Sequence, residues 1–322
     1  MKKSKIIQLI ALIIAVLILA AACATPDKPA APSAEKKFVV AYCQGESTSA
    51  WKLAQNDSMK KAIEGQGWEF RFADAGGSTP KQVADVEDFV NQGVDYICVS
   101  PREMDGLQPA LDAAKKAKIP VLLIDREINA KYGEDYLTFI GGDFHLEGVT
   151  AGNFIKDKWP NAKVVEITGT PATSVAMDRT NGFAEAIKGS GVTLVSQQNG
   201  DWSRATAEKV MANVAQAQKG NFDVVYSHSD EMTFGIIVAL KSAGLQPGKD
   251  VYIVSVDGQR LAIELIIEGE MAAIVECTPL HGPKAVEVIK DHLAGKTIPP
   301  KHILTGLVFD EKNAKDLLDR GV

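Results

Sequence analysis

Cysteine is scarce in this chain, and its scarcity excludes a disulfide framework. The 322 residues include four cysteines, Cys23, Cys43, Cys98 and Cys277, and the last three form an odd set in separate apolar runs. We therefore expect these three to be buried free thiols. The five histidines are scattered, without an HExxH motif or a cysteine at ligand spacing. The sequence predicts no metal site and no cofactor.

Motifs of common enzyme classes are also missing. The chain has no GxSxG nucleophile elbow and no GxGxxG after the first predicted strand. Gly295-Lys296-Thr297 ends like a phosphate-binding loop, but Lys290 stands where that loop requires glycine. We therefore expect a protein without enzymatic activity.

Positive charge is in deficit, which excludes nucleic acid as a partner. Lys and Arg number 35 against 41 Asp and Glu, a net charge of −6, and Lys2, Lys3 and Lys5 lie at the very start. The rest of the chain is therefore more acidic than the total suggests. Binding to nucleic acid phosphates requires clusters of Lys and Arg.

The N-terminus predicts a signal peptide over residues 1–22 and a lipid anchor at Cys23. Basic residues precede an apolar run from residue 9 to residue 22, which ends in three alanines directly before Cys23. This run is shorter than the ~20 residues of a membrane span and is typical of a secretory signal. Small residues before cysteine resemble the bacterial lipobox, which implies lipidation of Cys23. An uncleaved anchor or a plain secretory signal is the alternative.

Residues 23–37 predict a flexible tether, because proline and charged residues dominate the stretch ATPDKPAAPSAEKK. A lipid-anchored body needs such a spacer from the headgroups, and an ordinary disordered terminus is the alternative. We expect an extracytoplasmic protein tied to the cell membrane, at the cell surface or in the periplasm.

From residue 38 onward, buried strands alternate with amphipathic helices. The apolar runs that predict strands are 38–44, 69–73, 95–100, 121–125, 163–168, 193–196, 222–227, 251–256 and 272–276. Gly65, Gly93, Gly189, Gly244 and Gly269 stand where left-handed helix caps are expected. The pattern predicts an α/β fold of two doubly wound parallel-sheet lobes, with the change of lobe near residues 138–142.

Polar and aromatic residues follow the predicted strands, at the edge where open parallel sheets bind ligands. The candidate ligand-binding residues are Gln44, Ser49, Trp51, Lys52, Asp125, Arg126, Arg179, Trp202, Ser229, Asp257 and Glu276. Aromatic rings beside Asp, Arg and amide groups suit a neutral polyhydroxylated ligand. The structural alternatives are that Asp257 caps a helix starting at Gln259–Arg260, and that Trp202 is a core residue.

Seven stretches lie in order along the chain: YCQGESTSAWK, VLLIDREI, MDRTNGFAEAIK, GDWSRA, YSHSDEM, SVDG and VECTP. They resemble the type I periplasmic sugar-binding proteins of ABC importers, and most closely the galactofuranose-binding members of the ribose-binding group. The resemblance implies a monomer whose two lobes close on one monosaccharide and deliver it to an ABC permease. It also implies three crossings between lobes, near residues 140, 276 and 303. The lobes would then be 38–140 plus 276–303, and 141–275 plus 304–322.

The resemblance also assigns roles to individual residues. Trp51 is expected to stack on the sugar and Trp202 to pack on it from the far lobe. Asp125 and Arg126 would hold one edge of the ligand and Arg179 and Asp257 the other, with Glu276 beside it at a crossing. Two departures leave the sugar open: Lys52 stands where the galactofuranose binder has Arg, and Ser229 where the family usually has Asn.

Two other classes share this fold. A transcription-factor effector domain would begin with a DNA-reading helix-turn-helix rather than a signal peptide. A receptor that presents a sugar or furanose-like signal to a sensor kinase or chemoreceptor would have the same binding site as an import protein. Neighbouring genes would separate these two, because permease and ATPase genes favour import.

Overall fold

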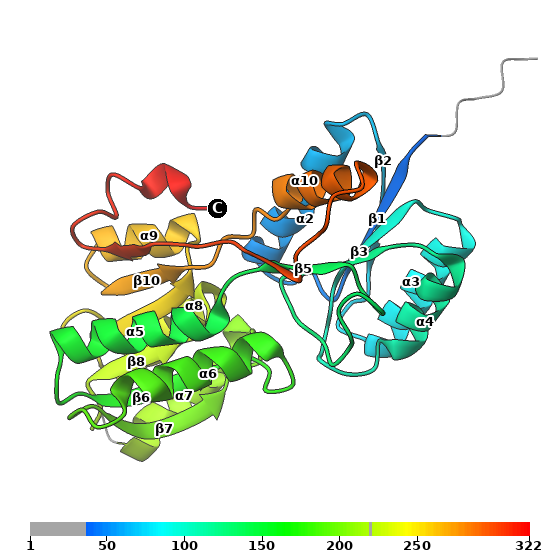
Figure 1. The fold of residues 1–322 in the computed structure, drawn as a ribbon. Helices are drawn as coiled ribbons and strands as arrows, with labels where there is room; N and C mark the ends of the chain where they lie inside the picture. The colour runs from blue at the N-terminus through cyan, green and yellow to red at the C-terminus, as the bar shows by residue number, and fades with distance from the viewer. Residues whose placement is uncertain (1–36, 219–220) are drawn as a thin grey trace, which may run out of the picture. The chain divides into compact units, whose positions relative to one another are not determined.

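The computed structural model describes residues 37–218 and 221–322, and within these the strands and helices form two α/β lobes (Figure 1). The first lobe contains β1 (Val39–Gln44), α2 (Ala50–Glu64), β2 (Glu69–Asp74), α3 (Thr79–Asn91), β3 (Tyr96–Ser100), α4 (Gln108–Ala117), β4 (Val121–Ile124), β5 (Thr138–Gly141), α10 (Gly282–Leu293) and β11 (Lys301–Ile303). The second contains α5 (Phe144–Lys158), β6 (Lys163–Thr168), α6 (Ser174–Ile187), β7 (Thr193–Asn199), α7 (Arg204–Gln218), β8 (Val224–Ser227), α8 (Asp230–Ser242), β9 (Tyr252–Asp257), α9 (Arg260–Ile267), β10 (Ala273–Glu276), β12 (Val308–Asp310) and a 3₁₀ turn (Leu318–Arg320).

Among the described residues the strands build two six-stranded sheets, ordered β11-β5-β4-β3-β1-β2 and β12-β10-β9-β8-β6-β7. Strand β12 runs antiparallel to β10, and the other paired strands are parallel. Central strands such as β1 and β3 are buried along their whole length, whereas the edge strands β2 and β7 are partly exposed. The predicted fold class is therefore confirmed.

Helices cover both faces of each sheet, as the apolar strands require. In β1, Val39, Ala41 and Cys43 pack into one core cluster and Val40 and Tyr42 into another, because successive side chains point to opposite faces. Helices α3 and α4 pack together on the first face, and α2 packs beside α10 on the second. In the other lobe α5 pairs with α6, and α7 with α8.

The chain passes between the two sheets three times. The first crossing joins β5 to α5, the second joins β10 to α10, and the third joins β11 to β12 (Figure 1). The second and third crossings lie side by side, since the Glu276 amide donates to Leu307 O at 2.8 Å. A Cβ on Gly306 would lie 2.1 Å from Glu276 O, so this approach requires glycine.

Some local predictions differ from the structure. The short strands β11 and β12 were not predicted, because three residues of mixed polarity such as KHI leave no apolar run. The left-handed cap predicted at Gly65 is wrong, since Gly65 has φ −61° and the left-handed residue is Gly67 at φ +74°. Gly93, Gly189, Gly244 and Gly269 do have positive φ, as predicted.

Cys43, Cys98 and Cys277 are free and buried, as predicted. Burial raises the pKa of the Cys43 and Cys98 thiols to about 12. In the part of the chain that the structure describes, no helix has the length and apolar character needed to cross a membrane, and no group of His, Cys, Asp and Glu could hold a metal ion. The predicted signal peptide, Cys23 and most of the tether lie outside the described residues.

Candidate functional site

A cavity lies beyond the carboxyl ends of strands from both sheets. Nine of the predicted residues line it: Ser49, Trp51, Lys52, Asp125, Arg126, Arg179, Trp202, Ser229 and Asp257. The cavity has the position of ligand sites in open α/β sheets. The two lobes also contact each other beside it, where the Glu127 amide donates to Ser174 Oγ at 3.0 Å.

A buried charge cluster forms the wall of the cavity in the first lobe. Lys52 Nζ lies 2.7 Å from Asp125 Oδ2, and Arg126 Nε lies 3.8 Å from the same oxygen. Burial alone would raise the pKa of Asp125, but the positive charges of Lys52 and Arg126 outweigh it and hold the pKa below its usual value. Asp125 is therefore an ionised hydrogen-bond acceptor at neutral pH.

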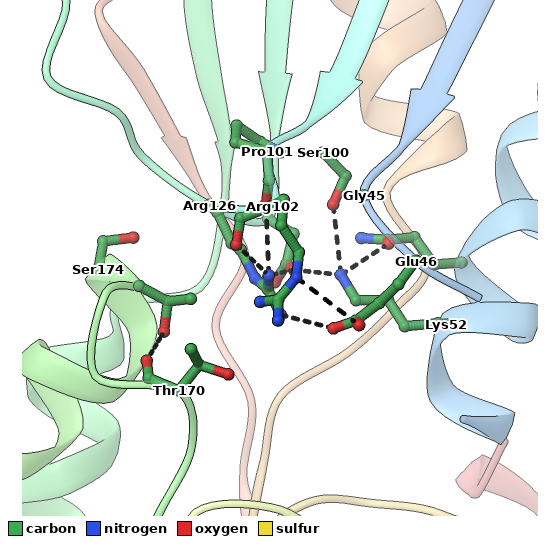
Figure 2. A network of polar contacts seen from close by, with 12 residues as sticks. Gly45, Glu46, Lys52, Ser100, Pro101, Arg102, Arg126, Thr170 and Ser174 are labelled. Carbon is green, nitrogen blue, oxygen red and sulfur yellow. Dashed lines mark hydrogen bonds and ion pairs between the residues drawn. The ribbon is translucent and has the colours of Figure 1, made fainter. Parts of the chain in front are cut away.

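Glu46 extends this wall and connects two arginines (Figure 2). Its carboxylate lies 3.8 Å from Arg102 Nε and 3.9 Å from Arg126 Nη2. Arg126 Nη1 donates to the Arg102 carbonyl at 2.8 Å, which fixes the guanidinium. Its buried Nε has no hydrogen-bond partner in the described structure, so one donor is left for a ligand.

In the second lobe the central cation is Arg179. Its Nε and Nη2 atoms each lie 2.8 Å from Glu147 Oε2, and Nη2 lies 3.9 Å from Asp257 Oδ1. The Arg179 side chain is 2% exposed. Glu147 therefore neutralises the guanidinium and leaves Asp257 at the edge of ion-pair range.

Asp257 also has a like-charged neighbour, Asp230. Its Oδ2 accepts from the Asp230 amide at 3.2 Å, while the Asp230 carboxylate accepts from Ser255 Oγ and from the amides of Gly258 and Gln259. Burial and the charge of Asp230 together raise the pKa of Asp257 well above its usual value. Asp230, not Asp257, takes the amides at the start of α9, so the alternative that Asp257 is only a helix cap there is wrong.

Three residues of the cavity have left-handed backbone conformations that non-glycine residues rarely adopt. The φ angles are +69° at Asp125, +55° at Trp202 and +128° at Asp257. Each such residue costs on the order of 1–3 kcal/mol, and the surrounding structure must enforce it. Strain of this kind concentrates at binding and catalytic sites, which agrees with the position of all three.

Two indoles face the cavity from different lobes. Trp51 is 6% exposed, and its Nε1 donates to the Cys277 carbonyl at 2.7 Å, next to the second crossing. Trp202 lies with its ring centroid 5.8 Å from the guanidinium carbons of both Arg126 and Arg179. Its buried Nε1 has no hydrogen-bond partner in the described residues. Trp202 packs against two core clusters and also lines the cavity, so it is more than a core residue.

A Cβ on Gly169 would lie 2.0 Å from Trp202 Cζ2, so the position of the indole depends on this glycine. The hydroxyls of Ser49 and Ser229 cap α2 and α8 by accepting from the amides of Lys52 and Met232. These two serines therefore hold helix starts at the cavity as well as lining it.

Two predicted residues do not line the cavity. Gln44 is fully buried behind it, where its side-chain amide donates to Tyr42, Gln55 and Asn56. Glu276 lies at the second crossing, but its Oε1 pairs with Arg320 Nε at 2.6 Å and its Oε2 accepts from the Leu307 amide. Both stand at strand ends, but neighbouring polar groups turn their side chains away.

The structure adds five lining residues that were not predicted: Glu46, Thr48, Val175, Glu231 and Cys277. Glu46 and Thr48 belong to the same strand-end loop as Ser49, so the rule that identified Ser49 could also have found them. Val175 and Cys277 carry no polar signal. Glu147, the partner of Arg179, sits in the first turn of α5, where an acidic residue is expected for the helix dipole alone.

Comparison with known proteins identifies the family. A profile described as Periplasmic binding protein domain matches residues 40–297. The galactofuranose-binding protein YtfQ of Escherichia coli (strain K12) is 36% identical over 290 residues, which cover 88% of this chain and 91% of that protein.

Two solved structures are similar over 88% of this chain. The periplasmic binding protein component of the arabinose ABC transporter from Shewanella sp. ANA-3, bound to α- and β-L-arabinofuranose, has a TM-score of 0.85 at 35% identity and is covered over 95% of its length. The fructose-binding periplasmic domain of the hybrid two-component system BT1754 has a TM-score of 0.80 at 28% identity and is covered over 94%. The resemblance seen in the sequence motifs is confirmed, and the chain belongs to the periplasmic binding protein family.

Proposed function

We propose that this protein captures one neutral monosaccharide, a furanose or pyranose of galactofuranose-like shape, and delivers it to an ABC permease. The observation that carries the proposal is the composition of the cavity. Four carboxylates and three cations line it together with two indoles, and both lobes contribute. The charges nearly balance, which favours a neutral ligand that can both donate and accept hydrogen bonds.

The chemistry of a sugar fits these groups. Hydroxyls would donate to Asp125 and Asp257, and their oxygens would accept from the unpartnered Nε of Arg126 and Nε1 of Trp202. The apolar C–H face of a sugar ring would pack on Trp51 or Trp202. A binding role without catalysis is also supported by the names of the similar proteins, which describe binding proteins.

Delivery of the sugar to a permease and a location outside the cytoplasm complete the proposed function. The similar arabinofuranose-binding protein is described as a component of an ABC transporter, which supports import through a permease. We propose that Cys23 carries a lipid and that the protein works as a monomer outside the cytoplasm, with residues 23–37 as its tether. A signal peptide over residues 1–22 accounts for this location.

Isothermal titration calorimetry of the protein without residues 1–23 tests the binding function. The panel would contain pentoses and hexoses that populate furanose and pyranose rings, inositols, and amino acids as charged controls. We expect one sugar to bind with a dissociation constant near micromolar or below, about −8 kcal/mol. Binding of an amino acid or peptide, with no heat from any sugar, would refute the proposal.

Sensing is the second candidate, because the fructose-binding domain of a two-component system has a similar structure. Uptake of the radiolabelled ligand by cells with and without this gene separates the two. Import predicts that deletion abolishes high-affinity uptake. A sensory role predicts unchanged uptake and the loss of ligand-induced gene expression or chemotaxis.

A further inference from the structure

Glu147 is a buried acid whose two carboxylate oxygens have different neighbours, and neither contact was expected from the sequence. On one side its Oε2 accepts from Arg179 Nε and Nη2, each at 2.8 Å. Its side chain is 8% exposed, so water competes little for this ion pair. Arg179 Nη1 donates to the His228 carbonyl, so the guanidinium is held along two edges.

The other side of Glu147 faces the crossings between the lobes. Its Oε1 lies 2.5 Å from where a Cβ on Gly142 would stand, so the carboxylate rests directly on the first crossing. Glu147 also lines a second hollow, together with Glu276 and the residues of the third crossing, Leu304–Val308. One carboxylate therefore contacts the cavity arginine and borders the segments that join the lobes.

The contacts of Arg179 show what Glu147 prevents. Asp257 Oδ1 lies 3.9 Å from Arg179 Nη2, too far for a hydrogen bond but close enough for a small rotation to make one. Without the charge of Glu147, Asp257 would be the nearest carboxylate left to the guanidinium. A direct Arg179–Asp257 bond would occupy the oxygen that we assign to ligand hydroxyls.

We propose that Glu147 is a positioning residue, which holds Arg179 and so keeps the Asp257 carboxylate available to the sugar. The proposal rests on the proposed function of the cavity. Glu147 does not itself contact the ligand, since it is absent from the lining of the ligand cavity. It acts through Arg179, and its position against Gly142 keeps this arrangement in register with the first crossing.

The test is a double-mutant cycle of Glu147→Gln and Arg179→Gln, with sugar affinity measured by calorimetry and unliganded stability by thermal melting. We expect Glu147→Gln alone to weaken binding by about 10- to 100-fold. In the Arg179→Gln background, the added Glu147→Gln change should weaken binding no further, because the guanidinium that Glu147 positions is already gone. A purely structural role would lower the melting temperature and weaken binding by the same factor in both backgrounds, which would overturn the proposal.

Glu185→Gln is the matched control, because Glu185 pairs with His145 on the exposed side of α6 and its side chain is 68% exposed. It should leave both affinity and stability unchanged. Should Glu147→Gln fail to fold, Glu147→Asp keeps the charge but shortens its reach, and wild-type affinity in that variant would equally overturn the proposal. If the wild type binds no sugar, the proposed function fails. If the wild type binds and Glu147→Gln binds equally well, only the positioning role fails.

Discussion

Replacing Asp257 by asparagine is expected to change stability and sugar affinity in opposite directions. Asp257 is buried and lies next to Asp230, and among the described residues its counter-charge is Arg179 at 3.9 Å, so its ionised form is unfavourable in the folded protein. Asparagine keeps an oxygen that can accept from the Asp230 amide. It is also one of the non-glycine residues that best tolerate a positive φ, which this position has. The substitution therefore removes the charge with little change of shape.

The magnitudes follow from these contacts. Relief of a poorly compensated buried carboxylate should raise the free energy of unfolding by about 0.5–2 kcal/mol, or roughly 1–4 °C in melting temperature. The same change replaces one of the two carboxyl oxygens by an amide NH2 group, which cannot accept a hydrogen bond from a sugar hydroxyl. We expect a loss of roughly 2–4 kcal/mol in binding, a factor of about 30 to 1,000 in the dissociation constant.

The stability gain should depend on pH. The pKa of Asp257 in the folded state is raised above the ~3.9 of an unfolded aspartate, because of burial and then Asp230. The stability that this shift contributes is complete below about pH 4 and is lost as the pH rises through the folded-state pKa. The D257N variant lacks this loss, so its advantage over wild type should be absent near pH 4 and grow toward neutral pH.

Differential scanning fluorimetry without ligand at pH 4, 6 and 7.5, and calorimetry with the sugar at pH 7.5, measure the two effects. Lower stability of D257N at neutral pH would refute the electrostatic reasoning. Wild-type affinity would refute the assignment of Asp257 to the ligand.

Three further predictions concern the aromatic wall, closure and anchoring. Trp51→Ala should weaken sugar binding by roughly 2–4 kcal/mol, whereas the control Trp159→Ala, whose indole stacks on Tyr252 outside the cavity, should bind like wild type; equal losses would exclude a specific role of Trp51. Saturating sugar should lower the radius of gyration in small-angle scattering, because a ligand that contacts both lobes favours their approach, and an unchanged value with confirmed binding would mean a rigid or already closed cleft. Cys23→Ser should release the protein from membranes, and a variant that still sediments with them would favour an uncleaved anchor.

Most of the fold was predictable because buried strands of a parallel sheet appear as continuous apolar runs. Strand β3, YICVS, is buried at every position and was predicted within one residue. The same rule gave most of the cavity, because Asp125 directly follows β4 and Asp257 ends β9, at the sheet edge where side chains from different loops converge. Edge strands β11 and β12 escape the rule because their three residues depend on a partner strand rather than on their own composition.

The remaining features depend on contacts between distant segments, which composition does not encode. Gln44 and Glu276 occupy strand ends like the other candidates, but Gln55 and Arg320 bind them elsewhere. Glu147 is an ordinary first-turn acid until α6 brings Arg179 against it. The position of the Trp202 indole likewise depends on Gly169, 33 positions earlier in the chain, where a Cβ would meet the ring.

The ion pairs of the cavity support our proposal that a neutral ligand bridges the two lobes. Lys52 pairs with Asp125 within the first lobe, and Arg179 with Glu147 within the second. Each pair is complete without the opposite lobe, so closure forms no new ion pair between these groups, and an ionic ligand would have to disrupt one of them. A sugar can instead bridge the two pairs by accepting from the cations and donating to the carboxylates on both sides. We therefore expect the ligand to add its contacts to the direct contacts between the lobes, such as that of Glu127 with Ser174, and so to shift the population toward the closed form.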